Sequence, residues 1–490
     1  MLFNSPDFLF KFLPVVFAGY LLLLHFSTPL TKLWIVAASL VFYAWFEPWH
    51  LVWLTISLLV NCGLSLPLSR LPRGKGKQAL LWIGIAFNLG MLFHFKYTEF
   101  AGSLFGGWFD QSNAVSSTTL PLAISFVTFT QIAYLVDVYR RETYRGSPLD
   151  YGFFALFFPH LIAGPILRHE EFGPQIRGRL PIPRFNDVLL GSFWLVIGLA
   201  KKVLLADGAA PYANALYADP ALIDNVTMLQ AWMATLAFAV QIYFDFSGYS
   251  DMAIGLARIF GLHFPLNFDS PYRAVSLQQF WSRWHMTLSR FLRDYLYIPL
   301  GGNRNGPARH ILNLMITMIV SGLWHGAGWT FVVWGALHGA FLTVTHVWQR
   351  MLSFMGVHKL NLSFRLSGWA LTFLFVVVTW VYFRAGSLRD AHVILTAMFS
   401  ARGWHAAVNH QSLEDLSYVG LLVALAILLP PTHQILPNLE RRLEGSKAWL
   451  VTSLRTLGTP GAGLATGILF FLVVKSFFSS QPSQFIYFKF

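Results

Sequence analysis

Apolar runs near the length of a bilayer span recur along the whole of this 490-residue chain, and they constrain its fold more than any other feature. A transmembrane helix needs about 20 mostly apolar residues. The candidate spans are 8–26, 30–47, 50–69, 78–95, 118–138, 187–206, 227–260, 309–325, 329–353, 366–384, 416–431 and 462–478. The shorter apolar pieces 150–166 and 277–300 are expected to be re-entrant or interfacial.

The composition supports a membrane protein. Hydrophobic residues make up 55% of the chain and charged residues only 12%, about half the charged fraction of a soluble domain. No polar stretch is long enough to enclose its own core. We therefore predict one all-α polytopic membrane domain over residues 1–490, with roughly 11–12 transmembrane helices.

Lys and Arg gather in a few loops. Cytoplasmic loops attract these residues, so we predict that the clusters face the cytoplasm. The clusters are Arg70, Arg73, Lys75, Lys77; Arg140, Arg141, Arg145; Arg168, Arg177, Arg179, Arg184; Arg283, Arg290, Arg293, Arg304, Arg309; and Arg441, Arg442, Lys447, Arg455. Both termini are then periplasmic. The net charge of +13 reflects these loops and does not indicate a nucleic acid partner.

The N-terminal stretch and the cysteine content argue against a cleaved signal and against disulfide bonds. The N-terminal stretch has no basic region or small-residue cleavage site, so we expect it not to be a cleaved signal. Cys62 is the single cysteine, which rules out a disulfide framework. We predict no metal site.

Polar groups inside candidate spans indicate either function or a buried pair. Asp245 and Asp251 lie in the apolar segment 241–258, and Ser247 and its neighbours are expected to loosen that helix. We favour structural support at a local helix break over a polar cavity. Lys201 and Lys202 either pair with these carboxylates or contact an anionic ligand, and the sequence leaves this open.

Segment 277–296 is predicted to be one amphipathic helix at the cytoplasmic side. Arg283, Arg290 and Arg293 occupy its basic face. His285 lies at the edge of the apolar stripe and turns towards protein. A structural and a functional role for this histidine are about equally supported. The apolar stripe consists of Phe280, Trp281, Trp284, Leu288, Phe291, Leu292 and Tyr295.

His325 is the strongest functional candidate. It lies sixteen residues after Arg309, about 24 Å along a helix, and therefore within a hydrocarbon layer of ~30 Å. Glycines at 322, 326 and 328 indicate that the helix ends or opens there and admits a substrate. An imidazole can act as a general base near neutral pH. His338 in the next helix is a weaker candidate with a structural alternative.

Two histidines, one on a cytoplasmic helix and one deep in the core, suggest a reaction across a membrane tunnel. A thioester donor suits this arrangement, because an imidazole could deprotonate the acceptor hydroxyl that attacks the acyl carbon. Coenzyme A is anionic, and the arginines at 283–309 could attract it.

Three motifs carry a family resemblance: YFDFSGYSDMAIGLARIFG (243–261), FWSRWHMTLSRFLRDYLYIPLGGNR (280–304) and SGLWHGAGWTFVVWGALHG (321–339). They closely resemble the membrane-bound O-acyltransferase family, in its bacterial alginate O-acetyltransferase branch. Residues 120–140, 157–168 and 484–490 also resemble that branch. The core motifs span 120–345, and 1–95 and 366–478 would form peripheral helices.

The resemblance implies roles for individual residues. His325 in the WHG motif matches the family's essential histidine, and His285 matches the second position. It also implies a ring of tilted helices around a tunnel. The residues expected to line or support that tunnel are Asp245, Ser247, Asp251, Trp281 and Trp324. Acetyl-CoA would be the donor, and no cofactor would be permanently bound. Charge alone, apart from the resemblance, predicts that Arg283, Arg290 and Arg293 contact this donor.

The resemblance further implies a place in a pathway. Acetyl would pass across the bacterial inner membrane to a periplasmic or membrane-anchored SGNH-type acetyltransferase, within a polysaccharide synthesis and export complex. Alginate is the favoured polymer, with cellulose and peptidoglycan as alternatives. Direct transfer is favoured over an acyl-enzyme, because no cysteine nucleophile is evident.

Two functions of other classes remain open at this stage. A transporter would also use Asp245, Asp251, Lys201 and Lys202, although no inverted repeat is visible to support one. A non-catalytic scaffold for a polysaccharide synthase is the third hypothesis.

Overall fold

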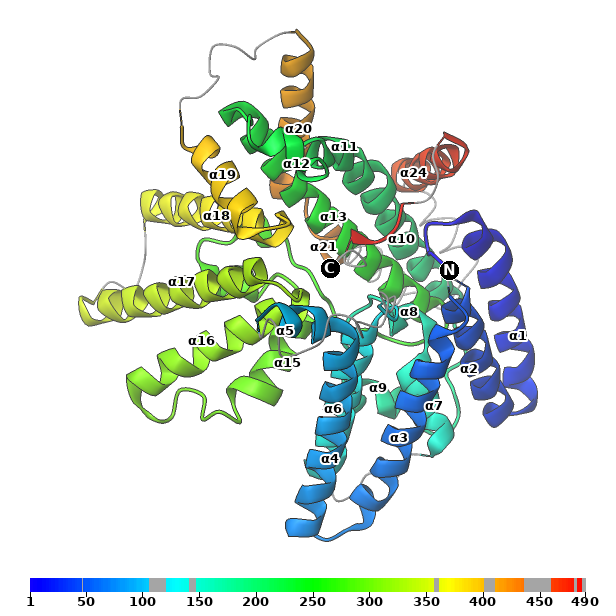
Figure 1. Ribbon diagram of the computed structural model, residues 1–490. Coiled ribbons are helices and arrows are strands. Elements are labelled where there is room, and N and C mark those ends of the chain that lie inside the picture. Colours follow the sequence, from blue (N-terminus) through cyan, green and yellow to red (C-terminus); the bar gives the residue numbers. More distant parts are fainter. Residues whose placement is uncertain are drawn as a thin grey trace. The chain divides into compact units, whose positions relative to one another are not determined.

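The computed structural model describes residues 1–45, 47–104, 120–140, 147–356, 361–400, 410–435, 460–479 and 483–486. The described residues are helices and connecting segments (Figure 1). The predicted basic residues at 141–145 and 441–455, and the last four residues of the C-terminal motif, lie outside the described residues. The all-helical prediction is confirmed for the part described.

The chain divides into two compact units. The first unit comprises residues 1–196, 249–265 and 474–489. Its helices are η1 (Phe8–Phe12), α1 (Leu13–Phe26), α2 (Thr28–Ala44), α3 (His50–Arg70), α4 (Lys75–Leu92), η2 (Phe93–Tyr97), α5 (Thr98–Leu104), α6 (Ile124–Arg140), α7 (Pro148–Leu156), α8 (Phe158–Leu161), α9 (His169–Ile176) and most of α10 (Phe185–Ala200).

The second unit comprises residues 197–248, 266–473 and 490. Helix α13 (Met228–Ile259) begins in this unit and ends in the first. Its other helices are η4 (Lys201–Ala206), α11 (Asp207–Tyr217), α12 (Pro220–Ile223), η5 (Pro271–Arg273), α14 (Leu277–Trp281), α15 (Met286–Leu292), η6 (Arg293–Tyr297), α16 (Gly306–His325), α17 (Trp329–Phe354), α18 (Leu362–Arg384), α19 (Leu388–Met398), α20 (His410–Leu428), α21 (Thr432–Ile435) and most of α24 (Pro460–Ser479).

Six helical stretches of the described chain are long and apolar enough to cross a membrane, fewer than the crossings expected from the sequence. Two further apolar helices, Thr28–Ala44 and Leu464–Phe477, are shorter. The six stretches are Phe8–Phe26, His50–Arg70, Lys75–Ser103, Phe185–Tyr217, Trp329–Phe354 and Leu362–Arg384. Each agrees with a run predicted from the sequence to within a few residues at its start.

A buried ion pair and a hydrogen bond to the backbone connect helices of the first unit. The ammonium of Lys32 on α2 lies 2.5 Å from a carboxylate oxygen of Asp150 on α7, and both side chains are largely buried. The hydroxyl of Tyr20 on α1 donates a hydrogen bond to the backbone oxygen of Pro181 at 2.9 Å. Such bonds satisfy polar groups that lipid cannot hydrate.

Close glycine contacts pack α16 against α17 in the second unit, where the two helices lie side by side (Figure 1). A Cβ on Gly322 would lie 2.2 Å from the backbone oxygen of Phe331, and one on Gly335 would lie 2.4 Å from that of Met318. Small residues let helix backbones approach closely where no hydrophobic force drives association in lipid. This packing holds the end of α16, and His325 with it, against α17.

Helix α13 corrects one prediction. The expected break around Ser247 and Gly248 is absent, because these residues lie inside an uninterrupted helix of 32 residues. Gly248 serves close packing instead: a Cβ there would lie 2.7 Å from the backbone oxygen of Gly198.

The structure also corrects the prediction for segment 277–296. It is not one continuous amphipathic helix, because α14 ends at Trp281 and α15 starts at Met286. Between them His285 adopts a left-handed backbone conformation with φ of 42°, which a helix cannot contain. The apolar residues of the predicted stripe are nevertheless buried, except for the half-buried Tyr295.

Candidate active site

His325 is the last residue of α16, and its side chain is buried. Gly326 continues the chain in an extended conformation, so the predicted helix end at this histidine is confirmed. Aromatic rings enclose the imidazole. Its centroid lies 4.9 Å from the ring of Trp324, 5.4 Å from Trp334 and 5.2 Å from Phe383.

The glycines beside His325 allow close helix packing. A Cβ on Gly326 would lie 2.0 Å from the ring of Phe331. Gly326, like Gly322, is therefore required by close packing of α16 on α17.

His285 lies in the turn between α14 and α15, and its side chain is fully buried. The left-handed conformation at a non-glycine residue costs of order 1–3 kcal/mol and persists only when the surroundings enforce it. Asn267 supplies that enforcement, because its backbone oxygen accepts a hydrogen bond from the backbone N–H of Met286 at 3.0 Å.

The side chain of Asn267 determines the tautomer of His285. Its Oδ1 accepts a hydrogen bond from the Thr287 hydroxyl at 2.9 Å and from the Thr287 backbone N–H at 3.3 Å. This atom also lies 3.1 Å from Nδ1 of His285. A carbonyl oxygen can only accept, so Nδ1 must carry the proton. Nε2 of His285 then holds a lone pair, and it is buried without a hydrogen-bond partner among the described residues.

One indole ring lies beside both histidines. The ring centroid of Trp324 is 6.1 Å from that of His285 and 4.9 Å from that of His325. Phe246 on α13 packs edge-on against His285 at 4.6 Å. The structure therefore brings His285 and His325, predicted from separate segments, next to the same indole ring.

His338 has both ring nitrogens occupied. Nε1–H of Trp281 donates to Nδ1 of His338 at 3.3 Å, and Nε2–H of His338 then donates to the Thr379 hydroxyl at 3.0 Å. The Thr379 hydroxyl donates onward to the backbone oxygen of Val376 at 3.0 Å. This closed chain supports the structural reading of His338 and gives Trp281 a supporting role.

The sequence left open whether Lys201 and Lys202 pair with carboxylates or contact an anionic ligand. Lys202 pairs with carboxylates. Its ammonium lies 2.6 Å from a carboxylate oxygen of Asp245 and 2.8 Å from one of Asp207. Lys201 donates a hydrogen bond to the Thr432 hydroxyl at 2.8 Å. Buried charges persist when they are paired in this way, so the arrangement supports the structural role favoured for Asp245.

Ser247 and Asp251 lie beyond Asp245 on the same helix, α13. Ser247 is buried, follows Phe246 directly along the chain and belongs to the second unit. Asp251 is also buried, but it belongs to the first unit.

The three predicted donor-binding arginines differ in exposure. Arg283 and Arg290 are half-buried. Arg293 is the most exposed and pairs with its neighbour Asp294 at 2.7 Å. The Arg283 backbone oxygen accepts a hydrogen bond from the backbone N–H of Asp269 at 2.9 Å, which ties it to the segment that carries Asn267.

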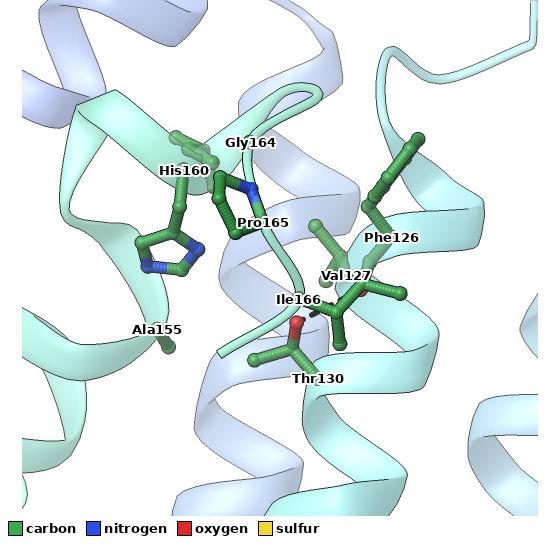
Figure 2. Close-up of a pocket in the computed structure, with 9 residues that line it drawn as sticks. Phe126, Val127, Thr130, Ala155, His160, Gly164, Pro165 and Ile166 are labelled. Atoms are coloured by element: carbon green, nitrogen blue, oxygen red, sulfur yellow. Dashed lines mark hydrogen bonds between the residues drawn. The ribbon is translucent and has the colours of Figure 1, made fainter. Parts of the chain in front are cut away.

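Another buried polar group, His160, lies in the first unit beside a small crevice. Figure 2 shows its imidazole next to Gly164 and Pro165, with Thr130 of α6 across the crevice. Nε2 of His160 donates to the backbone oxygen of Phe154 at 2.8 Å. The crevice holds only about 10 Å³, roughly the space for one water molecule. It is too small for a substrate.

Sequence reasoning missed Asn267 and Thr287. Asn267 stands between Leu266 and Phe268 in an otherwise apolar stretch, and such a polar residue is itself a signal. Its link to His285 depends on the turn at 282–285, which a helical projection does not contain. In the described part of the chain, no group of three or more His, Cys, Asp or Glu side chains is arranged to hold a metal ion.

Comparison with known proteins adds independent information. Residues 91–385 match the MBOAT, membrane-bound O-acyltransferase family. A peptidoglycan O-acetyltransferase of Helicobacter pylori is 36% identical, over 100% of this chain and 98% of its own length. A probable alginate O-acetylase of Pseudomonas aeruginosa is 38% identical, over 87% of this chain and 81% of its own length.

A more distant relative shares part of the chain. A teichoic acid D-alanyltransferase of Streptococcus thermophilus is 27% identical over 49% of this chain and 60% of its own length. The family match contains Asn267, His285, Trp324 and His325. This multi-pass chain is therefore a member of the membrane-bound O-acyltransferase family and an O-acyltransferase.

Proposed function

We propose that this protein takes acetyl from cytosolic acetyl-CoA and passes it across the bacterial inner membrane for O-acetylation of an exported polysaccharide. The observation that carries the proposal is the pair of buried histidines next to Trp324, with a lone pair on Nε2 of His285. We take the transferred acyl group to be acetyl because the names of two relatives specify acetyl transfer.

The chemistry needs one proton to move. An acceptor hydroxyl attacks the thioester carbonyl, a carbon–oxygen bond forms, and the carbon–sulfur bond breaks. We assign removal of the hydroxyl proton to His325, the predicted general base. The Nε2 lone pair of His285 accepts that proton from His325 and passes it to the coenzyme A thiolate, which leaves as the thiol. Asn267 stabilises the transient imidazolium by accepting from Nδ1–H.

The donor enters from the side of the arginine-rich loops. Arg283, Arg290 and Arg293 attract the phosphates of acetyl-CoA, and the segment of Arg283 leads directly into the His285 turn. The acceptor side is occupied by an SGNH-type acetyltransferase, which then modifies the polymer. Both termini lie on that periplasmic side.

The polymer is alginate or peptidoglycan, with cellulose as a further alternative. The alginate and peptidoglycan relatives are almost equally similar to this chain, at 38% and 36% identity. The peptidoglycan relative covers all of this chain, so both polymers belong in the test.

The experiment places the purified chain in vesicles with labelled acetyl-CoA, its SGNH-type partner and either alginate or peptidoglycan. We expect acetyl to reach one polymer, and His325→Ala and His285→Ala to reduce transfer by at least about a hundredfold, the lower end of the range for acid–base groups. His25→Ala is the matched control, because His25 is exposed at the end of α1. Undiminished transfer by a folded His325→Ala protein would contradict the proposal.

A further inference from the structure

A pocket of about 460 Å³ lies between the start of α16 and the end of α17. This volume falls within the range of about 300–1,000 Å³ that is usual for small-molecule sites. His310 of α16 and His346 and Arg350 of α17 line it, together with the side-chain amides of Asn303 and Gln349. None of the described residues that line the pocket is acidic.

The two imidazoles are held close together. Their ring centroids lie 5.1 Å apart with the planes at 67°. Nδ1 of His310 is 3.2 Å from the hydroxyl of Tyr297, which fixes the orientation of the ring. Nε2 of His310 is buried and has no hydrogen-bond partner among the described residues. A polar atom left in this state marks a site for a ligand group or water.

His346 is oriented as well. Its Nδ1 donates to the backbone oxygen of Leu342 at 2.8 Å, because a carbonyl can only accept. Arg350 follows one turn later and adds a guanidinium, whose planar fork matches phosphate oxygens. One permanent positive charge and two imidazoles, with no acidic residue on the lining, suit an anion with several acceptor oxygens.

The outer faces of these helices are apolar at the same level. Val347 lines the pocket and is also 58% exposed, while Val344 and Met351 on either side along α17 are exposed. Trp348 is exposed too, and tryptophan is enriched where membrane meets water. A ligand in this pocket therefore has a continuous apolar surface for hydrocarbon chains.

The pocket also lies far from the buried histidines. His310 is fifteen residues from His325 on the same helix, or about 22 Å, and so lies at the opposite end of α16 from the buried histidine pair. We propose that this pocket binds the phosphate of an anionic phospholipid, with its acyl chains along α16 and α17. The site is separate from His285 and His325 and from the transfer reaction.

The test measures phosphatidylglycerol retained by the detergent-purified full chain in native mass spectrometry. Arg350→Gln removes the guanidinium and should weaken binding about tenfold, the effect of one lost charge-assisted hydrogen bond. His346→Gln gives a second variant that should weaken it in the same direction. Arg365→Gln is the matched control, because Arg365 is exposed in the first turn of α18, and it should bind as the unaltered protein does.

Phosphatidylcholine and coenzyme A form two further arms. Phosphatidylcholine has the phosphate but no net charge, and we expect weaker retention. Equal phosphatidylglycerol binding by Arg350→Gln and the unaltered chain would overturn the proposal. The proposal would also be overturned if coenzyme A displaced phosphatidylglycerol and if Arg350→Gln bound coenzyme A more weakly. The pocket would then hold the acyl donor.

Discussion

The side-chain oxygen of Asn267 lies 3.1 Å from Nδ1 of His285 and compels that nitrogen to carry the proton, because the same oxygen also accepts from Thr287. Asn267 is thus a positioning residue for His285. The backbone oxygen of Asn267 adds a hydrogen bond to the turn itself. Tautomer and turn are therefore held by one residue.

Replacing Asn267 tests this relationship. In Asn267→Ala the proton on Nδ1 loses its acceptor, and we expect kcat to fall by about tenfold or more, the cost of one buried hydrogen bond of roughly 1–3 kcal/mol. Asn267→Asp adds a carboxylate that stabilises the imidazolium, so the rise of activity with pH should move to higher pH. A pH–rate profile measures both effects.

Thr287→Val is the comparison for that experiment. It removes the hydroxyl donor to Asn267 but keeps the backbone N–H, so the tautomer should be retained and kcat should change less than in Asn267→Ala. A pH profile of Asn267→Asp that coincides with that of the unaltered protein would show that Asn267 has only a structural role.

Thr379→Val tests the structural role of His338. The substitution leaves Nε2–H of a buried histidine without its acceptor, which should cost about 1–3 kcal/mol of stability. Acetyl transfer per folded molecule should stay unchanged, because His338 is saturated by structural bonds. The measurements are thermal unfolding in detergent and activity normalised to folded protein. A large loss of normalised activity at unchanged stability would assign His338 to the reaction.

Lys202→Met tests the buried ion triad. The substitution leaves Asp245 with no counter-charge from Lys202 at 2.6 Å and should destabilise the protein by about 3–5 kcal/mol. Combining Lys202→Met with Asp245→Asn should recover part of that loss, because the buried negative charge is removed as well. Asp207→Asn should cost less, since the Asp207 side chain is 26% exposed and water can replace its partner. Thermal unfolding of the four proteins checks the order.

Gly322→Ala tests the close packing that holds His325. The added Cβ would lie 2.2 Å from the backbone oxygen of Phe331, so α16 must move, at a cost of about 1–3 kcal/mol and with loss of activity. Gly328→Ala is the matched control. Its nearest contact would be 3.8 Å and its φ of −170° suits any residue, so stability and transfer should be unaffected. Equal behaviour of the two variants would contradict the packing argument.

The helical class and the membrane setting follow from the sequence, because a backbone in lipid must satisfy its hydrogen bonds within each segment and long apolar runs leave few other solutions. The end of a helix at His325 follows from its glycines. The burial of Phe280, Trp284 and Leu288 follows from their apolar character, even though the helix assumed for them is broken.

Helical periodicity assumes an unbroken helix, and the turn that presents His285 violates that assumption. The hydrogen bonds of Asn267, the ion triad of Lys202 and the closed chain through His338 join residues that are far apart in the sequence or depend on a local turn. These partners decide whether every hydrogen-bonding group of a buried polar residue is satisfied or whether one lone pair stays free. The sequence thus determined which polar groups would be buried in the membrane, whereas only the tertiary structure decided which of them are satisfied, because a hydrogen bond is a matter of distance and direction between side chains.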